Sequence, residues 1–226
     1  IPVIQAHYLP LTPTREFAAP LFPRPLPAGA LNRLSFHITR QVLWQSTRIG
    51  DAVTRQALEM PRASVWGPFR SLQQQRVPLL YGYSQHVLPR PDDWDDLNHI
   101  TGYWFLDPPA DWQPPADLVD FLRAGSPPVY IGFGSMGSRD PEAVTRLTLE
   151  ALALAGQRGV VASGWGGMMQ SRLPATVYML RAVPHSWLFP QMAAVVHHGG
   201  AGTTAAGLRA GVPSLVIPFM ADQPFW

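Results

Sequence analysis

The chain has 226 residues, of which 46% are hydrophobic and 14% are charged, so its composition is that of a folded protein and excludes a disordered one. Cysteine is absent, which excludes disulfide bonds, thiolate metal sites and a cysteine nucleophile. The formal net charge is only +2, yet residues 1–90 hold ten arginines against Glu16, Asp51 and Glu59.

The chain starts with an expected strand and a proline-rich arm. Its first residues, IPVIQAHYLP, have no basic region and no methionine, so they do not resemble a signal peptide and are interpreted as a strand. No apolar run approaches the roughly 20 residues of a membrane span. Prolines then recur in LPLTPT and APLFPRPLPAG, which predicts an irregular arm on the surface.

Residues 31–62 are predicted to be helical, with Pro61 as the stop. Arginines recur every seven or eight residues and would line one face: Arg33, Arg40, Arg48, Arg55 and Arg62. An apolar side would come from Leu31, Leu34, Ile38, Leu43, Ile49, Val53 and Leu58. A lipid would suit the apolar side and an anionic membrane the arginines, whereas a plain solvated face is the alternative.

The remainder divides into two short strands, a linker and a regular α/β region. The strands are expected in VPLLYGYS and LNHITGYWF, and residues 106–118, with four prolines, are predicted to be a semi-rigid linker. The predicted division is therefore a domain at 1–105, the linker at 106–118 and a second domain at 119–226. Apolar strands alternate with helices after the linker, which predicts an α/β fold with a parallel sheet.

Polar or glycine residues follow each expected strand of the second domain. They are Gly134 and Ser135, Ser163 to Trp165, Pro184 and His185, His197 and His198, and Asp222 and Gln223. Ligands of open parallel sheets bind outside the carboxyl ends of the strands, so these residues predict one ligand cleft.

The stretch HHGGAGTT predicts a phosphate site within that cleft. Gly199, Gly200 and Gly202 would let the backbone approach a ligand closely. The helix that follows offers free N–H groups and a positive dipole end, to which Thr203 and His198 would add donors. Asp222 and Gln223 together can accept from and donate to several hydroxyls, which indicates a sugar beyond the phosphates.

Two other interpretations of the same residues are less consistent with the pattern. Adjacent histidines on a strand point to opposite faces, so His197 and His198 would not easily share a zinc ion, and His197 is expected to be a packed residue. The segment GFGSMG (132–137) matches a dinucleotide-binding pattern, but the next strand ends in ASGW without the acidic residue that would hold a ribose.

The segment VPHSWLFPQMAAVVHHGGAGTTAAGLRAGVPSLVIPFMADQPFW resembles the donor signature of GT-B glycosyltransferases. It is most similar to sterol 3-β-glucosyltransferases and bacterial antibiotic glycosyltransferases, and PVYIGFGSMGS, PRPDDW and HITGYWFLD resemble the sterol branch. The resemblance implies two Rossmann-like domains, both incomplete in this chain. It also implies an inverting transfer of glucose from UDP-glucose to a hydroxyl of a sterol or similar lipophilic acceptor, without a metal or other cofactor.

The resemblance assigns donor-site roles to individual residues. Ser135 would lie near the diphosphate, and Val183 and His185 would contact the uracil and ribose. The phosphates would be held by His198, Gly200, Ala201, Gly202 and Thr203, and the glucose hydroxyls by Asp222 and Gln223. Either Trp165 or Trp187 would shape the nucleoside pocket, or both would be core residues.

The resemblance also implies what surrounds this site. The family's catalytic histidine lies upstream of the first residue, so the chain is expected to be truncated at both ends and to transfer no sugar alone. The enzyme would be cytoplasmic, with possible peripheral membrane contact and no nucleic-acid partner. Two alternatives stay open: a transferase for a polyketide, peptide or carotenoid acceptor with a UDP- or TDP-sugar, and a non-catalytic module that binds nucleotide-sugars or lipid.

Overall fold

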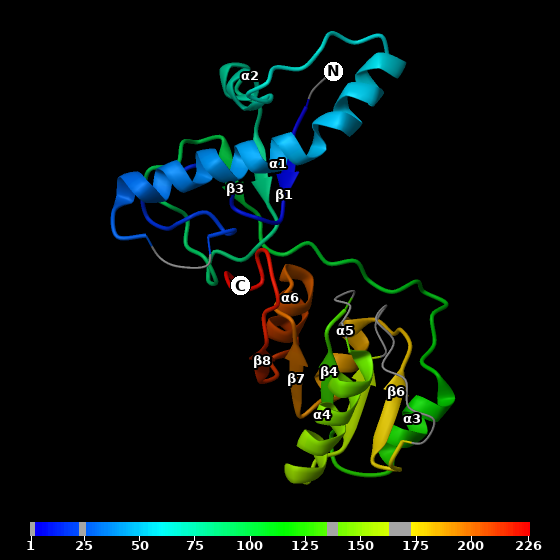
Figure 1. Cartoon of the computed structure of the whole chain (residues 1–226). Coiled ribbons are helices and arrows are strands. Elements are labelled where there is room, and N and C mark those ends of the chain that lie inside the picture. Colours follow the sequence, from blue (N-terminus) through cyan, green and yellow to red (C-terminus); the bar gives the residue numbers. More distant parts are fainter. Residues whose placement is uncertain (1–2, 23–25, 135–139, 163–172) are drawn as a thin grey trace. The chain divides into compact units, whose positions relative to one another are not determined.

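The computed structural model describes residues 3–22, 26–134, 140–162 and 173–226 (Figure 1). The chain forms two compact units: Ile1–Trp104 with Phe225, and Phe105–Pro224 with Trp226. Residues 105–115 contain no helix or strand, but the last three residues of the predicted linker already belong to helix α3 (Ala116–Arg123). No helix in the described ranges is long and apolar enough to cross a membrane.

The first unit contains a sheet of three short parallel strands in the order β1-β2-β3. These are β1 (Gln5–His7), β2 (Leu79–Tyr81) and β3 (Asn98–Ile100), and each falls inside a segment in which a strand was predicted. The unit also holds a long helix, α1 (Gly29–Ala57), and a short one, α2 (Phe69–Gln74). Its core is aromatic, with Tyr81 stacked on Trp94 at 4.9 Å between ring centroids.

Helix α1 ends four residues before Pro61, which corrects the predicted stop. Glu59 adopts a left-handed φ of 52°, and the N–H groups of Glu59 and Met60 bond back to the carbonyls of Gln56 and Arg55. This is a Schellman C-terminus, which satisfies the last carbonyls of a helix and turns the chain away from its axis. Arg62 therefore lies outside the helix and does not continue the arginine row.

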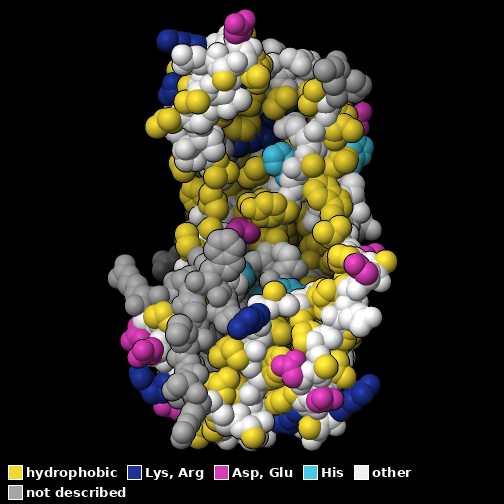
Figure 2. Space-filling view, turned by 90° about the vertical axis from the view of Figure 1, so that its right-hand side faces the viewer, with side chains coloured by type: hydrophobic (Ala, Val, Ile, Leu, Met, Phe, Trp, Pro, Cys, Tyr) yellow, Lys and Arg dark blue, Asp and Glu magenta, His cyan; other side chains and the backbone are white. Residues whose placement is uncertain are grey.

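The buried side of α1 is largely polar, whereas its apolar residues lie at the surface. The buried residues are Asn32, Ser35, Phe36 and Thr39. The predicted apolar side is exposed along the whole helix, from 37% at Leu43 to 82% at Ile49. Hydrophobic side chains (yellow) are visible at the molecular surface in Figure 2. The described residues leave the apolar row of α1 exposed, so it is accessible to a partner.

The proline-rich arm is irregular, as predicted, but parts of it are buried, which corrects the expectation of a surface arm. The hydroxyl of Tyr81 accepts the N–H groups of Leu11 and Thr12, and the Ser35 hydroxyl accepts that of Ala19. Thr12 also donates to Asn98 at 2.6 Å. Because side chains of the sheet and α1 bond the arm's polar groups, the arm can lie against the core without leaving them unsatisfied.

The second unit is a five-stranded parallel sheet in the order β6-β5-β4-β7-β8. Its strands are β4 (Val129–Gly132), β5 (Gly159–Ala162), β6 (Val177–Leu180), β7 (Ala194–His197) and β8 (Ser214–Val216). The helices are α3, α4 (Pro141–Leu154), α5 (His185–Leu188) and α6 (Ala201–Ala210), with a 3-10 turn, η1, at Phe189–Gln191. The predicted parallel α/β fold is confirmed.

Alternate strand residues of this sheet enter two separate hydrophobic clusters. Tyr130, Val160 and Val195 pack with Leu118 of α3 and with Leu188, Phe189 and Met192 around α5 and η1. Ile131 and Val161 pack with Leu152 of α4 and Val177. Neighbouring strand residues point to opposite faces, so the two clusters lie on opposite faces of the sheet. Helices cover both faces (Figure 1), which is why the strands are mostly apolar.

Helix α4 has the ends that its sequence predicts. The Asp140 carboxylate accepts the Ala143 N–H at 2.9 Å, and Pro141 occupies the first helical position. Gly156, just past the end, has a left-handed φ of 61°.

Candidate functional site

The candidate site lies where the winding of the second sheet reverses. β4 and β7 are neighbours although β5 and β6 come between them in the sequence. The order continues to β5 and β6 on one side and to β8 on the other, and Gly132 of β4 pairs with His197 of β7 at the carboxyl ends. Helices leave the sheet in opposite directions from such a point, which opens a crevice for a ligand.

The ring of His198 fits between two glycines at this point. A Cβ on Gly134 would lie 3.0 Å from the His198 Cε1 atom, and a Cβ on Gly200 would lie 2.5 Å from its Nε2 atom. Gly134 also has a left-handed φ of 62°, which favours glycine. Larger residues at either position would displace the imidazole, so the sequence places bare backbone on both sides of it.

Helix α6 begins directly after this ring and offers unpaired backbone donors. Gly200 is its N-cap residue with extended backbone, no side chain caps the helix, and no acidic residue lies in the first turn. A Cβ on Gly202 would meet no atom within 4 Å. The first N–H groups of a helix have no partner within it, so Ala201, Gly202 and Thr203 present donors and a positive dipole end beside His198.

His198 is a neutral hydrogen-bonding group at this site. Burial lowers its pKa, and the charge of Asp222 opposes that shift. Its Nδ1 atom is buried and has no hydrogen-bond partner in the described part of the chain. A neutral imidazole with an unpaired nitrogen can donate to or accept from a ligand without bringing a fixed charge.

His197 is a packed residue, as expected. Its side chain is completely buried, and its Nδ1 atom accepts the N–H of Gly199 at 3.1 Å. Burial lowers its pKa, with further contributions from His198 and His185. Gly199 itself has a φ of 87°, and a Cβ there would lie 2.7 Å from Val216 Cγ1. The pair His197–Gly199 therefore builds the turn that brings His198 to the crevice.

Val183 and His185 lie at the start of α5, after β6. Val183 packs against the cluster that contains Tyr130. The ring of His185 stacks on Phe189 at 4.4 Å between centroids and meets Tyr130 edge-on at 5.8 Å. Burial lowers the pKa of His185, so this ring is also neutral near pH 7. The stacking fixes the position of the first helical turn.

Asp222 and Gln223 lie in a tight turn after β8, and both side chains have partners within the turn. The Gln223 Oε1 atom accepts the N–H groups of Phe219 at 2.7 Å and Met220 at 3.0 Å. The Asp222 Oδ2 atom accepts the Trp226 indole N–H at 2.9 Å. The turn touches the histidine loop, because a Cβ on Gly199 would lie 3.0 Å from the Gln223 carbonyl oxygen.

The structure thus brings together His198, Gly200 and the α6 N-terminus with the Asp222–Gln223 turn. Ser135 and Trp165, predicted near the ligand, lie outside the described residues. Trp187 is partly buried and packs edge-on against Trp112 at 5.5 Å between ring centroids. No group of three or more metal-ligating side chains occurs in the ranges described.

Two features of the site were missed by sequence reasoning. Trp226 holds Asp222 through its indole N–H, and Phe133 after β4 meets Phe219 after β8 at 5.4 Å between centroids. The sequence signals these features only weakly: Phe133 and Phe219 are aromatic residues that follow strands, and Trp226 is one that follows the Asp-Gln pair. Such a signal does not separate a site residue from a core residue.

Comparison with known proteins agrees with this geometry. Residues 160–225 match the family described as erythromycin biosynthesis protein CIII-like, C-terminal domain. All of the chain aligns with the sterol 3-beta-glucosyltransferase UGT80A2 of Arabidopsis thaliana, at 42% identity and over 35% of that protein. It also aligns at 39% identity with the sterol 3-beta-glucosyltransferase of Aspergillus terreus, over 17% of its length. The chain spans about a third, or less, of these curated relatives.

Solved structures match the fold. The structure of UGT89C1 from Arabidopsis thaliana has a TM-score of 0.53 at 21% identity and covers 66% of this chain and 39% of that one. The calicheamicin glycosyltransferase CalG4 has a TM-score of 0.50 at 19% identity, over 81% of this chain and 46% of that one. These matches confirm the predicted GT-B architecture.

Proposed function

Because the chain is homologous over its whole length to sterol 3-beta-glucosyltransferases and has the GT-B glycosyltransferase fold, we propose that it supplies the donor site of a hexosyltransferase. The reaction would move glucose from UDP-glucose to a hydroxyl of a sterol or similar lipophilic acceptor, with inversion. The observation that carries the proposal is the bare backbone around His198 at the N-terminus of α6.

The chemistry of this site suits a departing diphosphate. When the acceptor hydroxyl attacks the anomeric carbon, the glycosidic C–O bond breaks and negative charge develops on the phosphate oxygens. The N–H groups of Ala201, Gly202 and Thr203 and a nitrogen of His198 would donate to that charge, which stabilises the transition state more than the substrate. A base must accept the hydroxyl proton. No residue of this chain is assigned to that step.

The sugar end of the donor would meet the turn after β8. Asp222 has one carboxylate oxygen bonded to Trp226, and its second oxygen would accept a glucose hydroxyl. Gln223 fixes the turn through its carboxamide oxygen and would place its amide group beside the same sugar. Val183 and His185 would contact the nucleoside. Neither a metal nor another cofactor is part of this proposal, and the enzyme would act in the cytoplasm.

The donor proposal is tested by UDP binding to this chain. Isothermal titration with UDP, UDP-glucose, TDP and NADH should show selectivity for the uridine nucleotides. His198→Ala should weaken UDP binding about tenfold or more, since it removes one hydrogen bond to a charged group. His86→Ala, an exposed histidine in the first unit, is the matched control and should bind as the wild type does. Equal UDP affinity in both variants would remove His198 from the site.

A membrane-bound acceptor is the second part of the proposal. The apolar row of α1, including Leu34, Ile38, Ile49 and Val53, is exposed and would contact a lipid surface. The surrounding basic residues favour an anionic one. Because Arg55 is already paired with Asp51 and the Pro61 carbonyl, the contact would rest on the apolar row and on exposed arginines such as Arg48.

Sedimentation with anionic vesicles tests this contact. The triple variant Leu34→Ser, Ile38→Ser, Ile49→Ser should lose most binding, because it removes three exposed side chains and leaves the buried face of α1 intact. Leu154→Ser, an exposed leucine of the second unit, is the control and should keep it. Full retention of binding by the triple variant contradicts the membrane part of the proposal and leaves the donor site untouched.

A further inference from the structure

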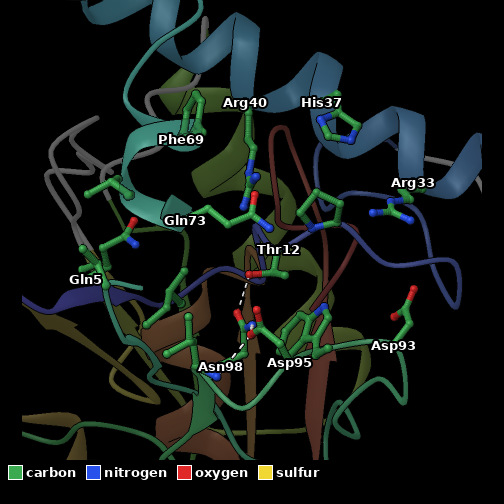
Figure 3. Close-up of a pocket in the computed structure, with 16 residues that line it drawn as sticks. Gln5, Thr12, Arg33, His37, Arg40, Phe69, Gln73, Asp93, Asp95 and Asn98 are labelled. Atoms are coloured by element: carbon green, nitrogen blue, oxygen red, sulfur yellow. Dashed lines mark hydrogen bonds between the residues drawn. The ribbon is translucent and has the colours of Figure 1, made fainter. Parts of the chain in front are cut away.

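A cavity of about 190 Å³ lies within the first unit, between α1, α2 and the amino-terminal ends of the three strands (Figure 3). Gln5, Leu79 and Asn98 contribute from the strands, and Phe69 and Gln73 from α2. It is formed entirely by the first unit and shares no lining residue with the site around His198.

Three nitrogen-rich side chains of α1 face this cavity. Arg33, His37 and Arg40 are spaced four and three residues apart, so they lie on one side of the helix, and Figure 3 shows them extending from it toward the cavity. The charges of Arg40 and Arg33 both lower the pKa of His37, after burial as the larger cause. The three groups therefore share a region of positive potential.

Arg40 is a partly buried cation that pairs with no carboxylate among the described residues. Its Nε atom donates to the Leu11 carbonyl at 2.8 Å, and its guanidinium carbon lies 5.2 Å from the centre of the Phe69 ring. No ion pair forms at Arg33, His37 or Arg40 with any described residue. Burying a charge is costly unless it is paired. Its outer nitrogens have no hydrogen-bond partner in the part of the chain that the structure describes, so they can donate to a ligand in the cavity.

The carboxylates across the cavity already have hydrogen-bond partners, Asp93 in the proline-rich arm and Asp95 within its own segment. Asp93 accepts the Thr14 hydroxyl at 2.6 Å and the Arg15 N–H at 3.0 Å. Asp95 accepts the Leu97 N–H at 3.2 Å and the Asn98 amide at 2.6 Å. Both side chains line the cavity and lower its potential without reaching the arginines. A small anion can therefore enter beside Arg40 and take the hydrogen bonds that these carboxylates do not.

We propose that this cavity binds a phosphate group through Arg33, His37 and Arg40. A phosphate has three oxygens to offer to three donor side chains, and guanidinium groups bind it in a fixed fork geometry. The group could belong to a soluble phosphorylated compound or to a phospholipid head group. Its binding balances the charge of Arg40, so the site stabilises the first unit when it is occupied.

The test follows the side-chain signals of the cavity in the full 226-residue chain by NMR. Inorganic phosphate should shift the Nε–H signal of Arg40 and the ring signals of His37 together, with a dissociation constant on the order of 1 mM. The double variant Arg33→Gln, His37→Gln should weaken binding at least about tenfold. Arg48→Gln, an exposed arginine of the same helix, is the control and should bind phosphate at these signals as the wild type does.

Two further arms separate this site from other causes. Asp95→Asn keeps a side-chain oxygen for its two donors but removes a negative charge from the cavity wall, so it should bind phosphate more tightly. Dihexanoyl phosphatidic acid, used below its micelle concentration, distinguishes the source. Binding tighter than that of inorganic phosphate indicates a lipid head group, and equal or weaker binding indicates a soluble phosphate compound.

The proposal fails if phosphate produces no saturable shift of Arg40 and His37 up to roughly 50 mM, a limit well above the expected constant. It also fails if the double variant and the wild type bind equally. His198→Ala should leave the phosphate shifts at Arg40 and His37 unchanged, since His198 belongs to the other unit. Loss of those shifts in His198→Ala would assign the effect to the site on α6 and overturn the cavity as a separate site.

Discussion

The two units present polar ligand groups in opposite ways. In the second unit the donors are backbone N–H groups at the start of α6, beside a neutral histidine held between glycines. In the first unit they are side chains of α1 that face a cavity. A backbone site needs glycines at particular positions of one loop. A side-chain site of the kind in the first unit needs a cavity whose walls come from segments distant in the sequence. The glycines of a backbone site form a pattern that can be recognised in the sequence, whereas the walls of a cavity do not.

The largest expected effect comes from replacing the glycines of the second unit, which tests whether its site depends on bare backbone. Gly199→Ala should destabilise the chain by about 3 kcal/mol, because Gly199 has a φ of 87° and an added Cβ would lie 2.7 Å from Val216 Cγ1. Gly202→Ala is the matched control, since its Cβ meets nothing within 4 Å, and it should change stability by less than about 1 kcal/mol. Urea denaturation measures both. A loss at Gly202 equal to that at Gly199 would contradict the role of close approach.

The pH dependence of the stability tests the buried His197 of the second unit. Burial lowers the folded-state pKa of His197 below its ordinary value of 6.5, so the unfolded chain takes up the proton first as the pH falls. The stability from neutral His197 is complete above about pH 6.5 and decreases below it, by up to 1.36 kcal/mol per pH unit for one proton. His197→Asn keeps an acceptor for the Gly199 N–H, and it should flatten the pH dependence between pH 7 and 5 in denaturant titrations. An unchanged slope would show that His197 does not titrate on unfolding.

Trp226 tests whether the sugar end depends on one side-chain contact. Trp226→Phe keeps an aromatic ring but removes the indole N–H that bonds Asp222. It should weaken UDP-glucose binding about threefold and leave UDP binding unchanged, since Asp222 is proposed to contact only the sugar. Calorimetry with the two ligands gives the comparison. An equal loss for both ligands would mean that Trp226 supports the whole site and not the carboxylate.

The smallest expected effect concerns metal ions. UDP binding should be the same in EDTA and in millimolar Mg²⁺, because helix N–H groups and His198 are proposed to hold the phosphates without a bridging cation. A difference of more than about threefold would show that a cation takes part, which the backbone description of this site does not include.

Much of the second unit could be predicted from the sequence because its signals are local. Asp140, Pro141 and Gly156 mark the ends of α4, and the glycines around His198 mark the turn after β7. The placement of Gln223 was harder to foresee. Its carboxamide oxygen bonds backbone within its own turn, and a dipeptide pattern does not separate that role from ligand binding.

The first unit was less predictable because its contacts are distant in the sequence. Arg40 lines a cavity with Asp93 and Asn98, more than fifty residues away, and the arm near Thr12 is fixed by Tyr81. The apolar row of α1 also misleads, since periodicity identifies an apolar side but not whether it is buried. The early end of α1 at Ala57 depends on a left-handed glutamate, which no common helix-stop signal indicates.

The two hydrogen bonds at Gln223 have a consequence for engineering. A carboxamide that ties down the N–H groups of Phe219 and Met220 sets the shape of the turn on which Asp222 is mounted. Replacing Gln223 would first reshape that turn, so a library at this position samples loop conformations before it samples side-chain contacts. A redesign of the proposed sugar contact should therefore vary residues 219 to 223 as one unit.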